Sequence, residues 1–290
     1  MTSNYPTSLG ETSSWARDNG ATVDEARRRF AQYAVLRAIS QSQALSASLV
    51  FKGGNALDFI WQPNRGTLDL DFSISGELAT EFTEQSIRRY FEQSLTIVGR
   101  QLSILFRVHR VDQNPPGDDK TFVTYEAKLG YALQDEQRLR RRMDLGMPST
   151  RVIEVDISLN DPICQYEERD LAGGTLRVCT LEDIVAEKLR ALLQQPIRNR
   201  GRRQDLLDIA FLRRYGRALD LSSVATFLRT KAHARSIHVS REAFRSREVL
   251  DRASSDYSAL QQVTRGLFIP YEEAVTELLR LVSELPINDQ

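Results

Sequence analysis

Lys52-Gly53-Gly54-Asn55-Ala56-Leu57 and Arg65-Gly66-Thr67-Leu68-Asp69-Leu70-Asp71-Phe72 are the two segments from which the fold can first be inferred. Apolar and polar residues alternate from Leu68 to Ser73, which is the period of a half-buried β-strand. Asp69 and Asp71 therefore lie on one face of that strand. The second segment thus predicts a strand with two neighbouring carboxylates on its polar side.

Two carboxylates side by side repel each other, and a cation between them removes that repulsion. Mg²⁺ prefers carboxylate oxygens, so Asp69 and Asp71 form a natural seat for this ion. The pair Gly53-Gly54 precedes Asn55–Ile60, which has the pattern of a short helix, and a helix start offers unpaired backbone N–H groups to a phosphate. Gly-Gly alone is usually a turn and Asp-x-Asp alone a solvated strand face, but both in this order predict a triphosphate site.

A further strand with acidic residues is expected over Arg151–Leu159. Its apolar residues alternate with Glu154 and Asp156, which share the other face. If this strand lies next to the strand of Asp69 and Asp71 in the sheet, one of its acids lies beside them. Two-metal phosphoryl transfer commonly uses a third carboxylate, which also accepts the proton. An ordinary edge strand with solvated acids is the alternative.

The third motif lies in the C-terminal half, where Glu182–Leu192 is followed by the arginine-rich stretch Arg198–Ile209. Lys188, on the first of these predicted helices, offers a point charge to the phosphates of a nucleotide. Asp205 is placed to orient Lys188 or an arginine, whereas Asp208, three residues on, is expected to anchor its helix. The ordinary alternative is a solvated, salt-bridged helix surface.

The composition places limits on partners. The chain has 290 residues, and Lys plus Arg and Asp plus Glu both total 39, so a nucleic acid would have to be held by a local basic patch. Such a patch suits an RNA phosphate backbone, although a charge run is more often a solvated face. Two candidates are Arg138, Arg140, Arg141 and Arg142, and Arg198, Arg200, Arg202 and Arg203. Few aromatic residues lie among them, which favours backbone contacts over base stacking.

The cysteines and histidines predict no metal centre. Cys164 and Cys179 are too few for a disulfide framework and lack metal-ligand spacing, which favours a packing role in a reducing cytoplasm. His109, His233 and His238 are scattered, which argues against zinc. The chain has no apolar run of about eighteen residues and no secretory signal, so we expect a cytoplasmic protein without a membrane partner.

Three regions are expected: a flexible arm over 1–22, an α/β lobe over 23–179 and a helical lobe over 180–290. In the α/β lobe we expect an amphipathic helix with a basic side and a second helix, then a hairpin around the turn Asn114–Asp119. The two helices should span 23–46 and 81–98, and the two strands of the hairpin should span 102–111 and 121–133. Helices of the last region should span 181–193, 204–215, 221–230, 241–254 and 271–284.

These motifs together resemble the AbiEii/AbiGii-type nucleotidyltransferase toxins, of the polymerase-beta-like nucleotidyltransferase superfamily. That family opens with Lys-Gly-Gly-(Thr/Ser)-Ala-Leu and Arg-x-Ser-x-Asp-Leu-Asp-Phe, then has Glu-Lys-Leu-x-Ala and (Arg/Lys)-Asp-x-x-Asp-(Leu/Ile). The resemblance covers about 51–212. Two residues depart from it: Asn55 replaces the usual Thr or Ser after the glycines, and Thr67 replaces the Ser of the second motif. Asn55 is still able to cap a helix and to donate a hydrogen bond to phosphate, so we expect a retuned site.

The resemblance implies an α+β fold, with a mixed-sheet nucleotidyltransferase lobe followed by a helical lobe. It implies transfer of an NMP from an NTP to an acceptor hydroxyl with two Mg²⁺ ions, by a toxin with a cognate antitoxin and with tRNA as an acceptor. The implied catalytic residues are Asp69, Asp71, Asp156, Lys188 and Asp205, of which the first three would ligate metal. Glu154 is the reserve for Asp156. The implied nucleotide-binding residues are Lys52, Gly53, Gly54, Asn55, Arg65, Thr67 and Lys188.

Two other functions stay open at this point. One is a catalytically degenerate module of the same fold that binds RNA or a protein, and the departure at Asn55 keeps it in view. The other is transfer to a protein side chain or to a small molecule such as an aminoglycoside. The sequence does not distinguish the NTP, because base selection depends on the shape of the pocket.

Overall fold

The computed structural model describes residues 4–74, 82–117, 120–171 and 173–287. The chain forms two compact units. The first consists of Met1–Ile60, Thr67–Asp161 and Tyr166–Val178, and the second of Trp61–Gly66, Pro162–Gln165 and Cys179–Gln290. One division therefore falls at the expected place near Cys179, but two short upstream segments also belong to the second unit. Parts of the expected arm, second helix, hairpin turn and helical lobe lie outside the described residues, at 1–3, 81, 118–119 and 288–290.

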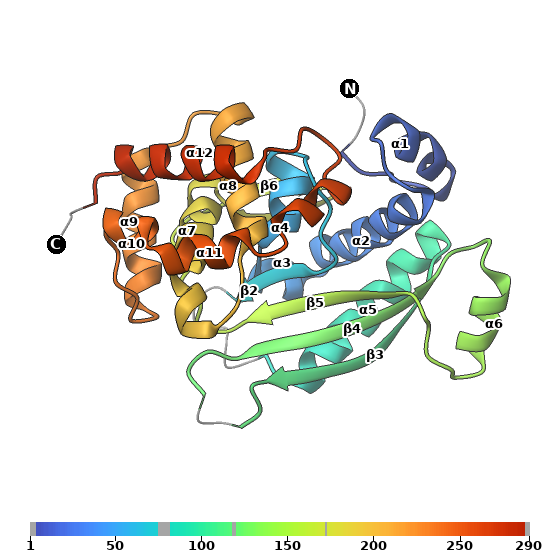
Figure 1. The fold of residues 1–290 in the computed structure, drawn as a ribbon. Coiled ribbons are helices and arrows are strands. Elements are labelled where there is room, and N and C mark those ends of the chain that lie inside the picture. The colour runs from blue at the N-terminus through green and yellow to red at the C-terminus, as the bar shows by residue number, and fades with distance from the viewer. Residues whose placement is uncertain (1–3, 75–81, 118–119, 172, 288–290) are drawn as a thin grey trace. The chain divides into compact units, whose positions relative to one another are not determined.

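A mixed sheet forms the first unit's centre, with seven strands among the described residues (Figure 1). They are β1 Leu49–Lys52, β2 Leu70–Ile74, β3 Leu105–Asn114, β4 Thr124–Ala132, β5 Val152–Ser158, β6 Tyr166–Leu171 and β7 Gly174–Cys179. Their order is β3-β4-β5-β2-β1-β7-β6. β2 pairs in parallel with β5 and antiparallel with β1, which itself pairs in parallel with β7. The expected α+β fold and the β3–β4 hairpin are confirmed.

Side-chain alternation explains the central strands. Ile153, Val155 and Ile157 of β5 are fully buried, while the residues between them are half-buried. The same pattern on β2 buries Leu70 and Phe72 on either side of Asp71. One face of these strands is thus apolar core, and the other presents polar side chains.

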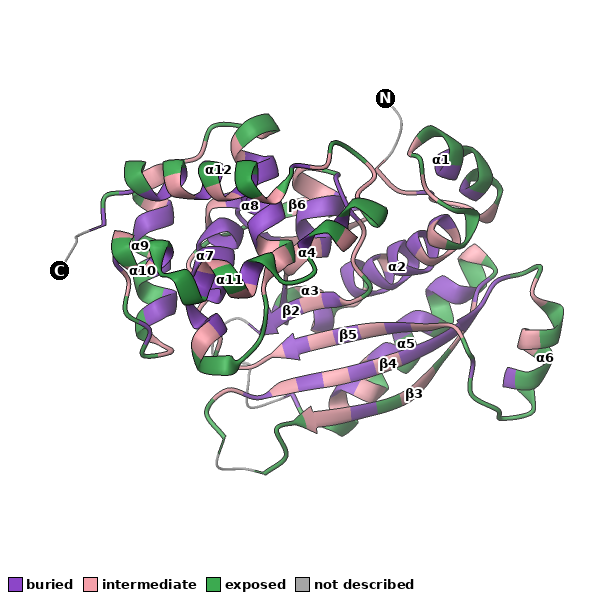
Figure 2. Ribbon diagram, in the orientation of Figure 1, coloured by how far each residue is buried: buried purple, intermediate pink, exposed green. Residues whose placement is uncertain are grey.

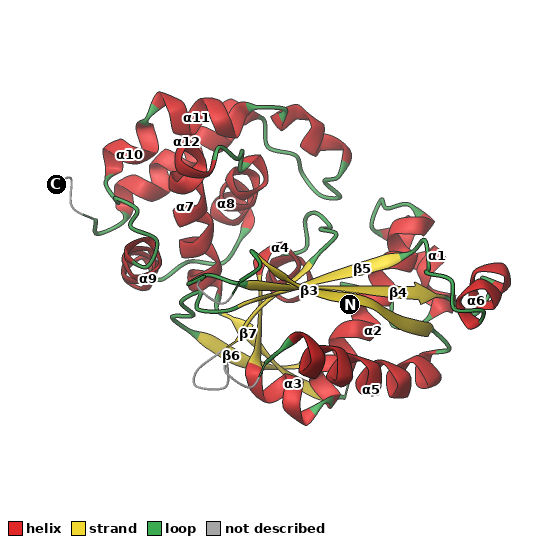
Figure 3. Ribbon diagram, turned by 90° about the horizontal axis from the view of Figure 1, so that it is seen from below, coloured by secondary structure: helices red, strands yellow, loops and turns green. Residues whose placement is uncertain are grey.

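Helices cover the sheet of the first unit, and Figure 3 shows α2, α3 and α5 along one side of it. The helices and helical turns of this unit are η1 Leu9–Glu11, α1 Thr12–Asp18, α2 Val23–Gln41, α3 Gln43–Ser48, α4 Gly53–Ala56, α5 Glu84–Leu102 and α6 Gln137–Asp144. α4 continues into a π-helical turn over Leu57–Trp61, most of which also lies in this unit. α5 confirms the helix expected over 81–98 apart from its start.

Two expectations about the N-terminal region are wrong. The segment expected as a flexible arm is folded, because Trp15 of α1 packs with Ala16, Ala21 and Ala26 in a small buried cluster. The following helix is not amphipathic with a basic side: α2 is buried along most of its length, as Figure 2 shows. Even Arg29 on this helix is buried.

The second unit is helical, as expected. Its helices and turns are α7 Leu181–Arg198, α8 Arg203–Tyr215, α9 Leu221–His233, α10 Arg241–Arg245, α11 Arg247–Ser254, η4 Tyr257–Gln262 and α12 Tyr271–Glu284. The single helix expected over 241–254 is broken at Ser246, whose backbone angles of φ −54° and ψ 129° are not helical. In the first unit, the strands β6 and β7 were not predicted. No helix among the described residues is long and apolar enough to cross a membrane.

Candidate active site

The register of the sheet places four charged residues in one row across it. Lys52 on β1 is opposite Asp71 on β2, Asp71 is opposite Asp156 on β5, and Asp156 is opposite Glu126 on β4. Neighbouring strands lie about 4.8 Å apart, and directly opposite residues share a face. The structure therefore brings Asp71 and Asp156 together from positions 85 residues apart in the sequence.

Asp156 is the carboxylate most strongly affected by this arrangement. Burial, followed by the negative charges of Asp71, Asp69, Glu126 and Glu154, raises the pKa of Asp156 to about 7. Each of these neighbours makes the ionised form less favourable. The row thus has an excess of negative charge that a divalent cation would relieve.

Glu154, the alternative to Asp156, is engaged elsewhere. Its Oε1 lies 2.5 Å from Nζ of Lys128, which is directly opposite it on β4. Asp156 instead has two acidic partners, Asp71 and Glu126, on the flanking strands. The register therefore favours Asp156 over Glu154 as the third carboxylate. Glu126 was not singled out from the sequence, although its position on the polar side of an alternating strand was a signal for it.

Gly53 lies directly against the carboxylate of Asp71. A Cβ atom built on Gly53 would lie 2.3 Å from Oδ2 of Asp71, and the φ angle of Gly53 is +75°. Both the space and the backbone angle therefore require glycine. Gly54 follows in the first turn of α4, where N–H groups have no partner within the helix. The preceding Lys52 forms an ion pair of 3.0 Å with Asp161.

Asn55 is not placed as expected. It lies inside α4 rather than at a cap, and its side chain is fully buried. Its amide donates to the carbonyl oxygens of Thr67 (3.2 Å) and Asp69 (2.6 Å), and its Oδ1 accepts from Nη1 of Arg29 (3.0 Å). Gln32 donates to the same Thr67 carbonyl at 2.9 Å. The Asn55 side chain therefore fixes the backbone from Thr67 to Asp69. This is a different role from the phosphate contact expected of Asn55.

Arg29 is a further residue that the sequence did not reveal. Its guanidinium forms a 2.6 Å ion pair with Asp58, and both side chains are buried. The guanidinium also lies 3.4 Å from the ring centroid of Phe59. Burial of an arginine is tolerated only when it is paired and hydrogen-bonded. Arg29 thus ties α2 to the helical turn that carries Asn55.

The second unit contains a buried cluster of two cations and two carboxylates. Nζ of Lys188 on α7 lies 2.9 Å from Asp205 and 2.7 Å from Asp208, both on α8. Asp208 also accepts two hydrogen bonds from Arg65, at 2.8 and 2.7 Å. The predicted partnership of Asp205 with Lys188 is confirmed, and Asp208 joins it. Arg65, expected to bind the nucleotide, is buried and uses its guanidinium on Asp208.

The charges of this cluster stabilise one another. Burial alone would lower the pKa of Lys188, but the carboxylates of Asp205 and Asp208 outweigh it and raise that pKa. Burial would likewise raise the pKa of Asp208, but Arg65 and Lys188 lower it. The charged forms of Lys188 and Asp208 are therefore both favoured. The buried pairing rules out the alternative of a simple solvated surface for Lys188 and Asp208.

Among the described residues, no three His, Cys, Asp or Glu side chains converge closely enough to form a ready-made metal site. Asp71 and Asp156 are nevertheless opposite each other on parallel strands. The spacing of about 4.8 Å between neighbouring strands allows the carboxylates of directly opposite residues to bind one ion. Their oxygen donors and the raised pKa of Asp156 fit Mg²⁺.

The chain matches one protein family over most of its length. The family described as "Nucleotidyl transferase AbiEii toxin, Type IV TA system" matches residues 34–277. The protein therefore belongs to the AbiEii family of nucleotidyltransferase toxins and is a nucleotidyltransferase. No curated protein sequence matches it.

Two solved structures share the fold at low sequence identity. MenT4, a nucleotidyltransferase toxin from Mycobacterium tuberculosis H37Rv, is 18% identical, with 96% of this chain and 91% of that chain covered and a TM-score of 0.58. JHP933 from Helicobacter pylori is 16% identical, with 90% and 91% covered and a TM-score of 0.50. These likenesses show a common fold.

Replacing Gly53 with alanine tests its contact with Asp71. Gly146 is the matched control, because its φ angle is +81° and nothing lies within 4 Å of its Cβ position. Gly146→Ala should cost about 1 kcal/mol of unfolding free energy from the backbone angle alone. Gly53→Ala should cost about 2–4 kcal/mol, since the overlap with Asp71 adds to that penalty. Urea unfolding measures both, and equal costs would show that the contact is unimportant.

The two aspartates of α8 should differ in their effect on stability. Asp208→Asn removes the buried carboxylate that Arg65 and Lys188 share and should lower the unfolding free energy by about 3–5 kcal/mol. Asp205→Asn removes a more exposed partner and should cost about 1 kcal/mol. Chemical denaturation compares them, with exposed Asp251→Asn as the neutral control. A smaller effect for Asp208→Asn would contradict the central position of Asp208 in the cluster.

Asp156 should make the metal-free protein less stable as the pH rises. Because its pKa is about 7 in the folded protein, against an ordinary value of 3.8 for an aspartate, the folded state binds more protons between these values. Unfolding free energy therefore falls from about pH 4 to pH 7 and levels off above it. Melting in EDTA across this range should show the slope, and Asp156→Asn should reduce it. An unchanged slope in that variant would exclude Asp156 as its source.

Proposed function

We propose that the protein transfers an NMP from an NTP to an acceptor hydroxyl in a Mg²⁺-dependent reaction, with tRNA as the acceptor. The observation that carries this proposal is the β2–β5 register, which sets Asp71 opposite Asp156 with Gly53 against the Asp71 carboxylate. Carboxylates with excess negative charge beside a glycine turn at a helix start suit a metal-bound triphosphate.

The transfer breaks one bond and forms one. The acceptor oxygen attacks the α-phosphorus of the NTP, the bond to the β-phosphate breaks, and pyrophosphate leaves. Mg²⁺, when bound, supplies stabilisation of the charge that develops on the attacking and leaving oxygens. Asp69, Asp71 and Asp156 would hold two such ions.

The chain's own residues have separate parts in this proposal. The Asp156 carboxylate accepts the proton of the acceptor hydroxyl, which is the part that a third carboxylate commonly takes in two-metal phosphoryl transfer. The absence of a side chain on Gly53 makes room for the Asp71 carboxylate, and the start of α4 offers backbone N–H groups to the phosphates. Lys188 uses two of its three N–H donors on Asp205 and Asp208, so its remaining donor is the one to offer a phosphate oxygen.

The position of Asn55 supports an active enzyme over a degenerate binding module. The departure at Asn55 was the sequence feature that favoured such a module. Its side chain is buried and bonded to Arg29, Thr67 and Asp69, so the substitution alters the support of the site rather than a substrate contact. Membership of the AbiEii family further supports a toxin with a cognate antitoxin.

Incubation with each α-labelled NTP, Mg²⁺ and bulk tRNA tests the proposal. We expect label to enter RNA and pyrophosphate to be released, and EDTA to abolish both. Asp71→Asn should lower the rate at least about 100-fold, the scale for losing one electrostatic stabiliser of the transition state. Glu154→Gln, also an acidic strand residue but paired with Lys128, should retain activity within about threefold.

Other outcomes would replace the proposal. Wild-type incorporation by Asp71→Asn would contradict the assigned site. Stable RNA binding without label transfer would favour the binding module. Label in a protein or aminoglycoside acceptor, and not in RNA, would identify a different acceptor class for the same chemistry.

A further inference from the structure

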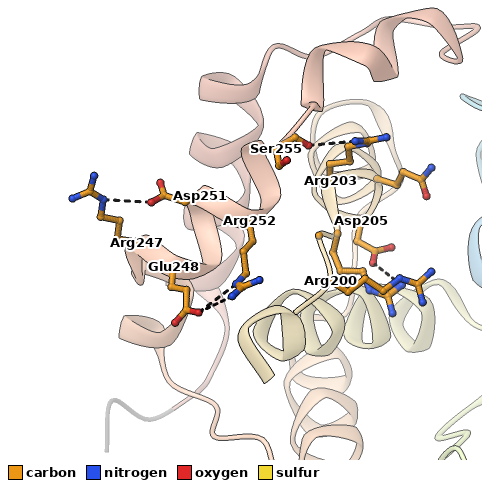
Figure 4. A pocket seen from close by; sticks show the side chains of 11 residues that line it. Arg200, Arg203, Asp205, Arg247, Glu248, Asp251, Arg252 and Ser255 are labelled. Atoms are coloured by element: carbon orange, nitrogen blue, oxygen red, sulfur yellow. Dashed lines mark hydrogen bonds and ion pairs between the residues drawn. The ribbon is translucent and has the colours of Figure 1, made fainter. Parts of the chain in front are cut away.

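The second unit contains an arginine-rich cavity of about 940 Å³, which Figure 4 shows from close by. The loop between α7 and α8 and the first turn of α8 form one side of it, and α11 forms the other. Five arginines line it: Arg200, Arg202, Arg203, Arg247 and Arg252. Three carboxylates oppose them, so the lining has a net positive charge in a chain whose formal charge is zero.

Hydrogen bonds hold the two sides of the cavity in place. Gln195 on α7 is buried; its side chain donates to the carbonyl of Val249 on α11 at 3.1 Å and accepts from the backbone N–H of Arg202 at 2.7 Å. Arg252 donates to Asn199 across the same gap at 2.6 Å. The cavity is thus pre-organised, which lowers the entropic cost of binding.

The arginines that face solvent are weakly committed to their present partners. Arg247 and its partner Asp251 are 94% and 67% exposed, and Arg200 is exposed. Arg202 lies 3.9 Å from Asp205. Exposed ion pairs contribute at most about 1 kcal/mol, so exchange of a carboxylate for a phosphate costs little.

The lining distinguishes between kinds of phosphate ligand. Among the described residues it contains no aromatic and no aliphatic side chain, whereas a pocket for a single nucleotide normally has an apolar wall against the base. Phosphates are therefore the groups it is suited to bind. Gln204, Glu248 and Ser255 add acceptors for ribose 2′-hydroxyl groups, which RNA has and DNA lacks.

The geometry points to this cavity as a docking site for the phosphodiester backbone of the RNA acceptor. The inference rests on the proposed transfer to RNA and adds the surface that holds the RNA. Asp205 connects the two, because it lines the cavity and also pairs with Lys188. Since Arg202 lies 3.9 Å from Asp205, an RNA phosphate at Arg202 would be separated from Lys188 by a single side chain.

The double variant Arg200→Gln/Arg247→Gln tests the inference. Neither side chain holds the fold, since Arg200 is exposed and Arg247, which is also exposed, forms its ion pair with exposed Asp251. The variant should bind labelled tRNA about tenfold more weakly at about 0.1 M salt. The slope of log binding constant against log salt concentration should become about 1.5 less steep. In the transfer assay the KM for tRNA should rise while the KM for the NTP stays the same.

Arg138→Gln/Arg141→Gln is the matched control, because it removes two exposed arginines from the other basic patch, on α6. It should bind tRNA like the wild type, and melting curves should be the same for all three proteins. An equal loss in this control, or unchanged tRNA binding by Arg200→Gln/Arg247→Gln, overturns the inference. Equal affinity of the wild type for RNA and for DNA of the same length also overturns it.

The binding measurement separates this inference from the proposed function. Asp71→Asn should lose transfer yet bind tRNA with wild-type affinity and salt slope, because Asp71 lies outside the cavity. If the wild type binds tRNA through the cavity but transfers no label, the docking site stands and the proposed reaction fails. If it transfers label to RNA and the cavity variant is unaffected, the reaction stands and the docking site fails.

Discussion

The parallel pairing of β2 with β5 is the constraint on which the carboxylate row depends. Leu70 is opposite Val155 and Phe72 is opposite Ile157, and all four are fully buried. A slip of one residue would turn these apolar side chains to the polar face and bury the acids. Hydrophobic packing on one side of the sheet therefore fixes the positions of Asp71 and Asp156 on the other, and their repulsion is a cost that this packing offsets.

A short stretch of chain connects the carboxylate row of the first unit with the buried charge cluster of the second. Arg65 is held in the second unit by Asp208, and Thr67 is held in the first by Asn55 and Gln32. Arg65 and Asp69 are only four positions apart. The motif is continuous in the sequence, yet its residues belong to both units. Arg65 pairs with Asp208 in the second unit, whereas the aspartates belong to the first.

Local patterns predicted what depends on local physics. Alternation located β5 and placed Glu154 and Asp156 on one face, and helix-period residues located α7, α8 and α12. The neighbour of each strand was not predictable in the same way, because pairing depends on residues far away in the chain. This is why periodicity left the choice between Glu154 and Asp156 open and did not single out Glu126. Burial of polar residues was the other failure: Arg29 and Asn55 look solvated by residue type, yet each is buried with partners that lie distant in the sequence.

The bond from Arg29 to Asn55 has an evolutionary consequence. A serine or threonine at position 55, as in the family pattern, has a shorter side chain and cannot both hold the two loop carbonyls and reach the guanidinium. A lineage that acquires asparagine there gains an acceptor that a buried arginine needs. Positions 29 and 55 should therefore covary among relatives, and a chimera that exchanges one without the other should fold poorly.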